Sequence, residues 1–234
     1  MSTIQVTETT TSRLERWAPL GGIIFVALMI SGTYFVADVP EPAAPQEAIA
    51  AYLVEGGNHM RNLIGAYVWV LGALAFLWFL TRLRSVLRGA EGGMGTLSNL
   101  AFGAGVIYSA LMMASAVAFA AVAYAVALRG APVSDTDFVR VLPQMAWMLL
   151  LLGAGFAGFL VVIATCIVSF KTRVLPRWLS WLGIVLAIVL LFDVIYVNIL
   201  PFLLWVVVAS IVLLMRREQK ATAAASPNER IRVK

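Results

Sequence analysis

The sequence contains few of the residues on which most metal sites and catalytic centres depend. Its 234 residues include one cysteine, Cys166, and one histidine, His59. One cysteine excludes a disulfide within the chain, and one histidine excludes a bis-histidine haem and a histidine-based zinc site. The sequence also lacks a GxxxxGK[ST] loop for nucleotide hydrolysis. It therefore predicts no cofactor, no metal site and no catalytic residues, and an enzymatic role is the least favoured one.

Charged residues are scarce as well. They make up 12% of the chain, whereas hydrophobic residues make up 62% and the mean hydropathy is +0.92. An ordinary soluble domain has about 45–50% apolar and about 25% charged residues. A compact soluble fold of this size could not bury so much apolar surface, so a soluble globular domain is excluded. The net charge of +5 follows from membrane orientation, and we expect no nucleic-acid partner.

Long apolar runs occupy most of the chain. A bilayer core about 30 Å thick requires about 20 residues of helix, and six stretches meet this requirement. They cover about 18–37, 62–83, 97–128, 144–170, 178–197 and 200–215. The last two share the stretch between Arg177 and Arg216, so they must be short helices in a tight hairpin. The predicted fold class is all-α, a polytopic transmembrane bundle of six helices.

Basic residues are distributed unevenly between the two sets of connections. If both termini are inside, 14 of the 17 basic residues lie on the inner side, and Arg61, Arg129 and Arg140 lie outside. Positively charged connections stay in the cytoplasm, so the sequence predicts an N-in/C-in topology. The excess of arginine over lysine suggests a bacterial genome, which places the chain as a multi-pass protein of a bacterial cytoplasmic membrane. Membrane lipid is then an expected partner.

This topology divides the chain into three parts. Residues 1–17 form a cytoplasmic N-terminal segment, and residues 18–215 form the six-span transmembrane domain. Residues 216–234 are rich in alanine and charge, and we expect them to form a disordered cytoplasmic tail.

The first outer loop contains a helical signal of its own. Residues 45–55 predict a short amphipathic helix that begins at a proline and ends at Gly56 and Gly57. Asn58 can then cap the second span. The apolar face of the loop helix consists of Ile49, Tyr52 and Leu53.

A second outer connection shows a similar pattern. Ser134 and Asp137 resemble a capping box, which predicts a short helix that carries Arg140. Pro143 is expected to kink this helix where it enters the membrane.

Small residues recur at four-residue spacing in the third and fourth spans. Such spacing lets helix backbones approach closely, so these two spans should be central in the bundle. The same surfaces could join this chain to a membrane protein partner or to a second copy in a homo-oligomer. The residues are Ala101, Gly105 and Ser109 in the third span, and Gly153, Ala154, Ala157 and Gly158 in the fourth.

Asp193 is the one acid inside an apolar stretch. A carboxylate at that depth is costly and should face protein or water. Polar residues expected at the same outer level complete a candidate ligand-binding pocket with Asp193. They are His59, Arg61, Asn62, Arg140 and Asn198. In the alternative interpretation, which is the more common situation, Asp193 pairs with an arginine or asparagine and only fixes the hairpin to the bundle.

Three patterns carry a resemblance to a known family. They are Leu175-Pro176-Arg177-Trp178-Leu179-Ser180-Trp181-Leu182-Gly183, Asn58-His59-Met60-Arg61-Asn62 after the outer helix, and Arg82-Leu83-Arg84. With its overall layout, the chain resembles a family of uncharacterised six-span bacterial integral membrane proteins, a domain of unknown function. The resemblance covers about 18–215 and implies the six-span fold. It implies no activity, and no catalytic residue is carried over from it.

Three classes of function remain open. The favoured one is a non-enzymatic membrane helper, sensor or binder with a polar pocket near the outer face. The second is a small secondary transporter, although the sequence shows no inverted repeat and no matched pair of Gly/Pro-broken helices. The third is an intramembrane enzyme that uses Asp193 and His59.

Overall fold

A computed structural model of the chain describes residues 18–36, 44–45, 47–48, 51–52, 56–130, 136–191 and 199–225, without the side chains of 56–57, 136–138, 140 and 216–225. These residues form an all-helical structure in which no strand is described, so the all-α part of the prediction is confirmed, whereas six spans and the N-in/C-in topology stay predictions. The helices are α2 (Leu20–Val36), α4 (Gly56–Glu91), α5 (Thr96–Arg129), α6 (Thr136–Met148), η1 (Leu149–Ala154), α7 (Gly155–Thr172), α8 (Arg177–Leu191) and α10 (Leu200–Ala225).

Three of the helices are long and apolar enough to cross a membrane. They are Asn58–Glu91, Thr96–Arg129 and Val141–Thr172, and each contains at least 32 residues. At 1.5 Å per residue each extends about 50 Å, so their apolar middles can span a bilayer core of about 30 Å and their ends can project. Shorter apolar helices cover Leu20–Val36, Arg177–Leu191 and Leu200–Met215. All of these helices overlap the six predicted spans.

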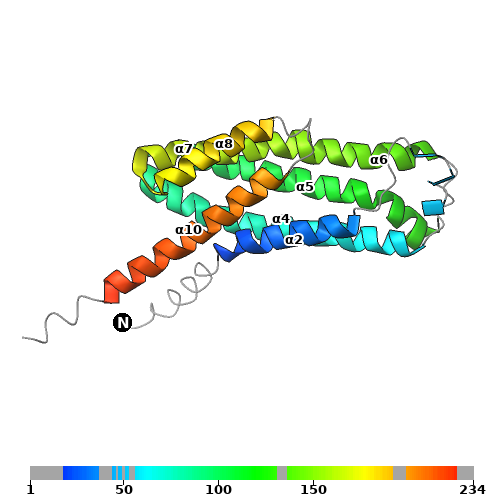
Figure 1. The fold of residues 1–234 in the computed structure, drawn as a ribbon, viewed down its shortest axis with the longest axis horizontal. Helices are drawn as coiled ribbons and strands as arrows, with labels where there is room; N and C mark the ends of the chain where they lie inside the picture. Colours follow the sequence, from blue (N-terminus) through cyan, green and yellow to red (C-terminus); the bar gives the residue numbers. More distant parts are fainter. Residues whose placement is uncertain are drawn as a thin grey trace, which may run out of the picture.

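The helices pack in chain order and close into a ring. Of the described helices, α2 packs on α4, α4 on α5, α5 on α7, α7 on α8, α8 on α10, and α10 back on α2. Figure 1 shows α2, α4, α5 and the α6–α7 rod side by side along the long axis. In the same view α8 and α10 cover part of that length, and α10 crosses obliquely and extends beyond the bundle. The last two helices thus form the short hairpin that the limited sequence between Arg177 and Arg216 predicts.

Aromatic side chains fill the centre of the ring. Phe25 of α2 lies 4.8 Å from Phe76 of α4, measured between ring centroids, and Tyr108 of α5 lies 4.5 Å from Phe202 of α10. Phe76 also contacts Tyr108 and Phe202, at 5.2 and 5.6 Å. All four side chains are buried. Four helices therefore meet in one aromatic cluster, and its burial contributes to the stability of the fold through area and ring geometry.

Glycine permits the close approach of α2 and α4. A Cβ added at Gly32 would lie 2.3 Å from Cδ1 of Trp69 and 3.1 Å from the carbonyl oxygen of Gly65. The indole nitrogen of Trp69 also donates a hydrogen bond to the carbonyl of Met29, at 3.3 Å. The two backbones could not pack this closely if Gly32 carried a side chain.

The small residues of the third and fourth spans are used inside this chain. A Cβ at Gly105 would lie 2.4 Å from Cδ1 of Leu80, and one at Gly158 would lie 3.2 Å from the Phe202 ring. α5 packs against α4, α6, η1 and α7, and α7 packs against α4, α5 and α8. The small residues therefore let both spans approach their neighbours in the ring closely, whereas the predicted central position and oligomerisation through these surfaces stay predictions.

The fourth predicted span is an interrupted helical rod. Pro143 lies inside α6, where it lacks the N–H that would bond to the preceding turn. The helix then changes to a π-helix over Leu149–Ala154, and the Gly155 N–H bonds to the Leu150 carbonyl. From α5, the Ser115 hydroxyl donates to the Ala146 carbonyl at 2.8 Å. The Ala146 carbonyl, between Pro143 and the π-segment, thus accepts a hydrogen bond from a neighbouring helix. Serine side chains commonly provide such bonds next to irregular backbone in membrane-embedded helices.

Two helix ends differ from the sequence prediction. Gly56 and Gly57 begin α4 instead of ending a loop helix, so Asn58 lies within the first turn and is not the cap. Glycine is accepted at the beginning of a helix, where it is among the residues found at the N-cap. At the other end of the chain, α10 continues to Ala225, into the stretch for which a disordered tail was expected. Alanine, glutamate, glutamine, lysine and arginine are all good helix formers, which explains this extension.

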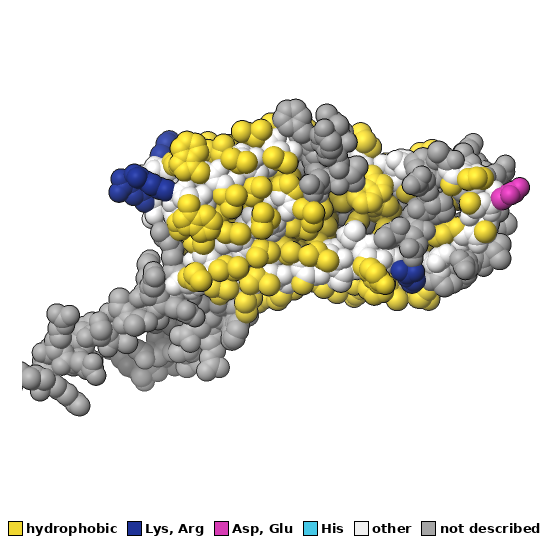
Figure 2. Space-filling model, in the orientation of Figure 1, with side chains coloured by type: hydrophobic (Ala, Val, Ile, Leu, Met, Phe, Trp, Pro, Cys, Tyr) yellow, Lys and Arg dark blue, Asp and Glu magenta, His cyan; other side chains and the backbone are white. Residues whose placement is uncertain are grey.

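Charge marks the two ends of the bundle. Figure 2 shows hydrophobic side chains over the middle of one face and basic side chains gathered at the end where α7 meets α8. The described basic residues at this end include Lys171, Arg173 and Arg177, all of them exposed. Arg129 lies at the opposite end, as the last residue of α5.

Candidate functional site

Polar side chains are buried together at the end of the bundle opposite the α7–α8 turn. His59 and Asn62 lie one helical turn apart at the beginning of α4, and they are 2% and 4% exposed. Tyr52, from the loop before α4, is 8% exposed and covers both of them. The Asn62 side-chain amide donates a hydrogen bond to the Tyr52 hydroxyl. We call these three residues the Tyr52 cluster.

The His59 imidazole packs against the Tyr52 ring. The ring centroids are 5.9 Å apart and the planes meet at 72°, an edge-to-face arrangement. Such a contact adds about 0.5–1.5 kcal/mol to the free energy gained from buried area. Tyr52 therefore fastens the loop to α4 with two groups at once, its ring on His59 and its hydroxyl on Asn62.

Arg61 lies beside the Tyr52 cluster but faces a different direction. Its guanidinium carbon lies 5.9 Å from the ring centroid of Tyr34, near the end of α2. Tyr34 is 72% exposed, so this cation–π contact lies at the surface. Contacts of this kind contribute about 0.5–1 kcal/mol at exposed sites. Arg61 thus links α4 to α2 at the rim of the site.

The structure therefore brings together part of the predicted pocket. His59 and Asn62 share one buried cluster, and Arg61 lies at its edge. Arg140 is part of α6, but its side chain lies outside the described residues. Asp193 and Asn198 also lie outside the described residues. Their membership of the pocket stays a prediction.

The described ends of the α8–α10 hairpin lie well below the Tyr52 cluster. Leu200, the first residue of α10, lines the same groove as Ile30. Ile30 is level with Trp69, whose indole bonds to Met29. His59 precedes Trp69 by ten residues of α4, which corresponds to about 15 Å along the helix axis. Any contact between the hairpin and His59 must therefore come from the segment between α8 and α10.

Sequence reasoning missed Tyr52 as a member of the site. The helical spacing placed it on the apolar face of the loop helix with Ile49 and Leu53. A tyrosine differs from those two residues because its buried hydroxyl requires a hydrogen-bond partner. That requirement, together with the asparagine shortly after it in the chain, was the available signal.

The interior between the two ends is packed rather than polar. Buried hydroxyl groups along the described spans bond to carbonyls of their own helices, for example Ser109 to Gly105, Thr165 to Val161 and Ser210 to Val206, at 2.7–3.0 Å. No group of three His, Cys, Asp or Glu residues in the described ranges could hold a metal ion. The chemistry that the described side chains offer is hydrogen bonding at the Tyr52 cluster.

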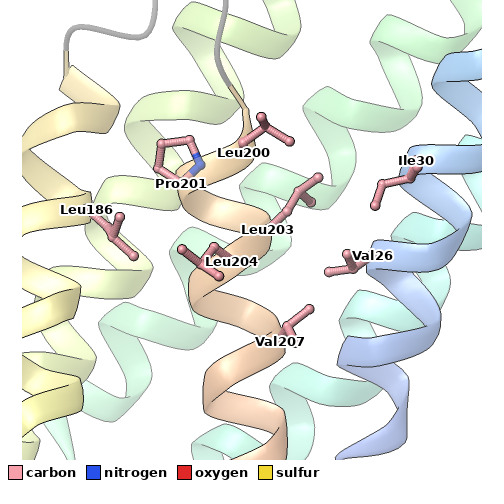
Figure 3. A pocket seen from close by; sticks show the side chains of 8 residues that line it. All are labelled: Val26, Ile30, Leu186, Leu200, Pro201, Leu203, Leu204 and Val207. Atoms are coloured by element: carbon pink, nitrogen blue, oxygen red, sulfur yellow. The ribbon is translucent and has the colours of Figure 1, made fainter.

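An open apolar groove lies on the lateral surface. It has a volume of about 480 Å³ and is formed by α2, α8 and α10. Figure 3 shows side chains of α2 and α10 facing each other across it, with Leu186 of α8 beyond α10. Every lining residue is apolar, so the groove suits hydrocarbon rather than a polar solute. The lining consists of Val26, Ile30, Leu186, Leu200, Pro201, Leu203, Leu204 and Val207.

No protein-family model, no curated protein and no solved structure matches this chain.

Proposed function

We propose that this chain is a multi-pass protein of a bacterial cytoplasmic membrane, with six spans and both termini inside. Three helices long enough to cross a bilayer and three shorter apolar helices support this proposal. The shortest, Arg177–Leu191, extends about 23 Å, which is a little less than the bilayer core of about 30 Å. The uneven distribution of basic residues supports the orientation.

Within that membrane, the protein acts as a non-enzymatic helper, sensor or binder. The observation that carries this proposal is the separation of polar and apolar groups. The Tyr52 cluster places a buried imidazole, amide and phenol at one end, and an aromatic cluster fills the centre of the ring. A translocation path needs polar groups along the whole depth of the membrane. The described interior is packed with apolar side chains, which favours a helper, sensor or binder over a transporter.

A secondary transporter is the second candidate. The interruption of the α6–η1–α7 rod favours it, because transporters place irregular helical backbone at substrate sites. Transporters of this kind have a matching interruption in a second, repeat-related helix. In the described residues, Pro143 and the π-segment have no such counterpart. An intramembrane enzyme that uses Asp193 and His59 is the third and least supported role.

Flux measurements on the purified chain in liposomes test the proposal. The liposomes contain a trapped pH-sensitive dye and are exposed in turn to proton, sodium and potassium gradients. A helper or binder gives dye responses equal to those of protein-free liposomes. Flux above that background, abolished by Asp193→Asn but retained in Arg129→Gln, would replace the proposal with proton-coupled transport.

A further inference from the structure

The turn between α7 and α8 presents three cations from a short stretch of backbone. Lys171 lies in the last turn of α7, Arg173 lies in the turn and Arg177 begins α8, and all three are exposed. Like charges this close repel one another, so an anion placed among them is stabilised. We call Lys171, Arg173 and Arg177 the basic turn.

Hydrogen bonds beneath the basic turn fix its backbone. The Ser180 hydroxyl donates to the Ser169 hydroxyl at 2.7 Å, and the Leu175 N–H lies 3.3 Å from the same oxygen. The Arg173 N–H donates to the Ser169 carbonyl at 2.8 Å. Leu175, Ser169 and Ser180 are all buried. The cations therefore project from a preorganised loop, which lowers the entropic cost of binding.

Arg173 has a backbone conformation that usually belongs to glycine. Its φ is 56°, the one positive φ of a non-glycine residue in the described ranges. This is the C-cap position of α7, where glycine is common because it carries no Cβ. The chain thus places a cation in the turn at some cost in backbone strain.

An apolar strip begins next to the basic turn and continues along α8. Trp178, Trp181, Val185 and Ile188 occupy one helical face and are 52–63% exposed. The Trp181 ring is held edge-to-face against Phe170 of α7, with centroids 5.3 Å apart. Tryptophan favours the headgroup level of a bilayer, and the valine and isoleucine continue toward its hydrocarbon. The cations therefore match the phosphate of a phospholipid, and the apolar strip matches its acyl chains.

Two other charged groups at this end, Arg84 and Glu91, are engaged within the protein. Arg84 donates to Oδ1 of Asn99 at 2.9 and 3.2 Å and lies over the Phe102 ring. Glu91, the acid described at this end, accepts hydrogen bonds from Leu97 and Ser98 at the beginning of α5. Lys171 also interacts weakly with Glu91, so the three cations of the basic turn keep a net positive charge beside this one acid.

We propose that the basic turn and the exposed face of α8 form a binding site for an anionic phospholipid. Its phosphate lies among Lys171, Arg173 and Arg177, and one acyl chain follows Trp178, Trp181 and Val185. The proposal rests on the membrane location proposed above. It does not depend on the Tyr52 cluster or on the outcome of the flux measurement.

Thermal unfolding of the full chain in a neutral detergent tests this site. Phosphatidylglycerol is titrated in, and phosphatidylcholine with identical acyl chains and inorganic phosphate are titrated separately. We expect a saturable rise in melting temperature with phosphatidylglycerol only. The double variant Arg173→Gln, Arg177→Gln should need about thirtyfold more lipid for the half-maximal rise, because each of the two basic residues near anionic lipid contributes about 1 kcal/mol.

A matched control loses a positive charge at the opposite end of the bundle. Arg129→Gln removes the exposed arginine that ends α5 and should respond to lipid as the wild type does, whereas Arg177→Gln should need more lipid. An equal loss of response in Arg177→Gln and Arg129→Gln would overturn the proposal, since the effect would then reflect net charge. An equal response to phosphatidylcholine or to inorganic phosphate would also overturn it.

A second measurement tests the site with single variants, in case the double variant does not fold. Native mass spectrometry counts the lipids retained by the wild type and by Arg177→Gln alone, after extraction from membranes that contain both lipid classes. Retained phosphatidylglycerol that decreases in Arg177→Gln and not in Arg129→Gln supports the site. Equal retention in all three proteins contradicts it.

Discussion

The two ends of this bundle hold their polar groups in opposite ways. At the α7–α8 end, Lys171, Arg173 and Arg177 are exposed, and hydrogen bonds to Ser169 fix the backbone beneath them. At the other end, His59 and Asn62 are buried, and a side chain from a separate segment covers them. One end presents charge to its surroundings, whereas the other end uses polar groups to fasten a loop.

This difference predicts different effects of substitution at the two ends. The exposed cations cost little in desolvation, so their removal should change binding more than folding. The buried amide and phenol at the other end share a hydrogen bond, so removal of either one breaks a buried polar contact. Substitutions can therefore test the comparison directly. The first concerns the packing of α2 against α4, which lies between the two ends.

The largest effect is expected where α2 meets α4. In Gly21→Ala the new Cβ would lie 2.7 Å from the carbonyl oxygen of Ala75, a backbone atom that cannot move aside. We expect a loss of about 2–3 kcal/mol in unfolding free energy, as for other overpacked cores. Gly103→Ala is the matched control, because nothing lies within 4 Å of its new Cβ. Unfolding in a denaturant series should show the loss for Gly21→Ala only, and equal midpoints would contradict the packing.

The next largest effect is expected at the Tyr52 cluster. Asn62→Leu removes the amide that donates to the Tyr52 hydroxyl and leaves that hydroxyl buried. The expected loss is about 1–3 kcal/mol, the usual cost of an unsatisfied buried group. Tyr52→Phe combined with Asn62→Leu removes both partners and should recover part of the loss. A double-mutant cycle on thermal unfolding measures the coupling, and strictly additive effects would show that the two groups do not interact.

A smaller effect is expected at the basic end. Ser169→Ala removes the hydroxyl that Ser180 and the Leu175 backbone share, and we expect a loss of about 1 kcal/mol. Thr165→Ser is the control, because its hydroxyl can still bond within its own helix. Melting temperatures in detergent distinguish the two variants. A Ser169→Ala protein as stable as the control would mean that this bond network does not hold the turn.

The smallest effect concerns pH. Hydrogen bonds from the Leu97 N–H, the Ser98 hydroxyl and the Ser98 N–H hold the pKa of the Glu91 carboxyl below its ordinary value, with a minor contribution from Lys171. Glu91 lies beyond the arginines that follow the apolar part of α4, outside the membrane-spanning segment. Because folding lowers this pKa, the stabilisation is complete at neutral pH and is lost as the pH falls through the folded value.

Glu91→Gln provides the measurement for that effect. The variant should melt slightly below the wild type at neutral pH, and the gap should close as the solution is acidified below the ordinary carboxyl range. Glu47→Gln, at the other end, removes an exposed acid and serves as the control. A gap that stays constant with pH would show that the carboxylate charge is not what caps α5.

Much of the fold could be predicted from the sequence because lipid imposes a simple rule. A run of about 20 apolar residues must form a helix in a bilayer, so the positions of the described helices followed from composition. The short α8–α10 hairpin followed from counting residues between Arg177 and Arg216. Helix ends were less predictable, since α4 begins at Gly56 and α10 continues to Ala225. Outside the apolar run, local propensity and tertiary contacts decide where a helix ends.

The candidate site was less predictable, because it depends on how separate segments meet. His59 and Asn62 could be placed together from their spacing on one helix. Tyr52 comes from a loop, and no period in the sequence specifies which residue of α4 it will cover. The π-segment over Leu149–Ala154 also lacked a signal, because its one glycine, Gly153, can equally well be interpreted as a packing residue. The prediction for Asp193 and Asn198 remains to be tested, since both lie outside the described residues.

Labelling of single cysteines in intact cells tests the central claim most directly. With Cys166 replaced by serine, Arg129→Cys and Lys171→Cys place one thiol at each end of the bundle. If the chain spans the membrane with its basic end inside, a membrane-impermeant maleimide labels the Arg129→Cys protein in intact cells. It labels the Lys171→Cys protein only after the cells are permeabilised. Labelling of Lys171→Cys in intact cells, with Arg129→Cys protected, would contradict the orientation, and labelling of both would contradict a membrane-spanning bundle.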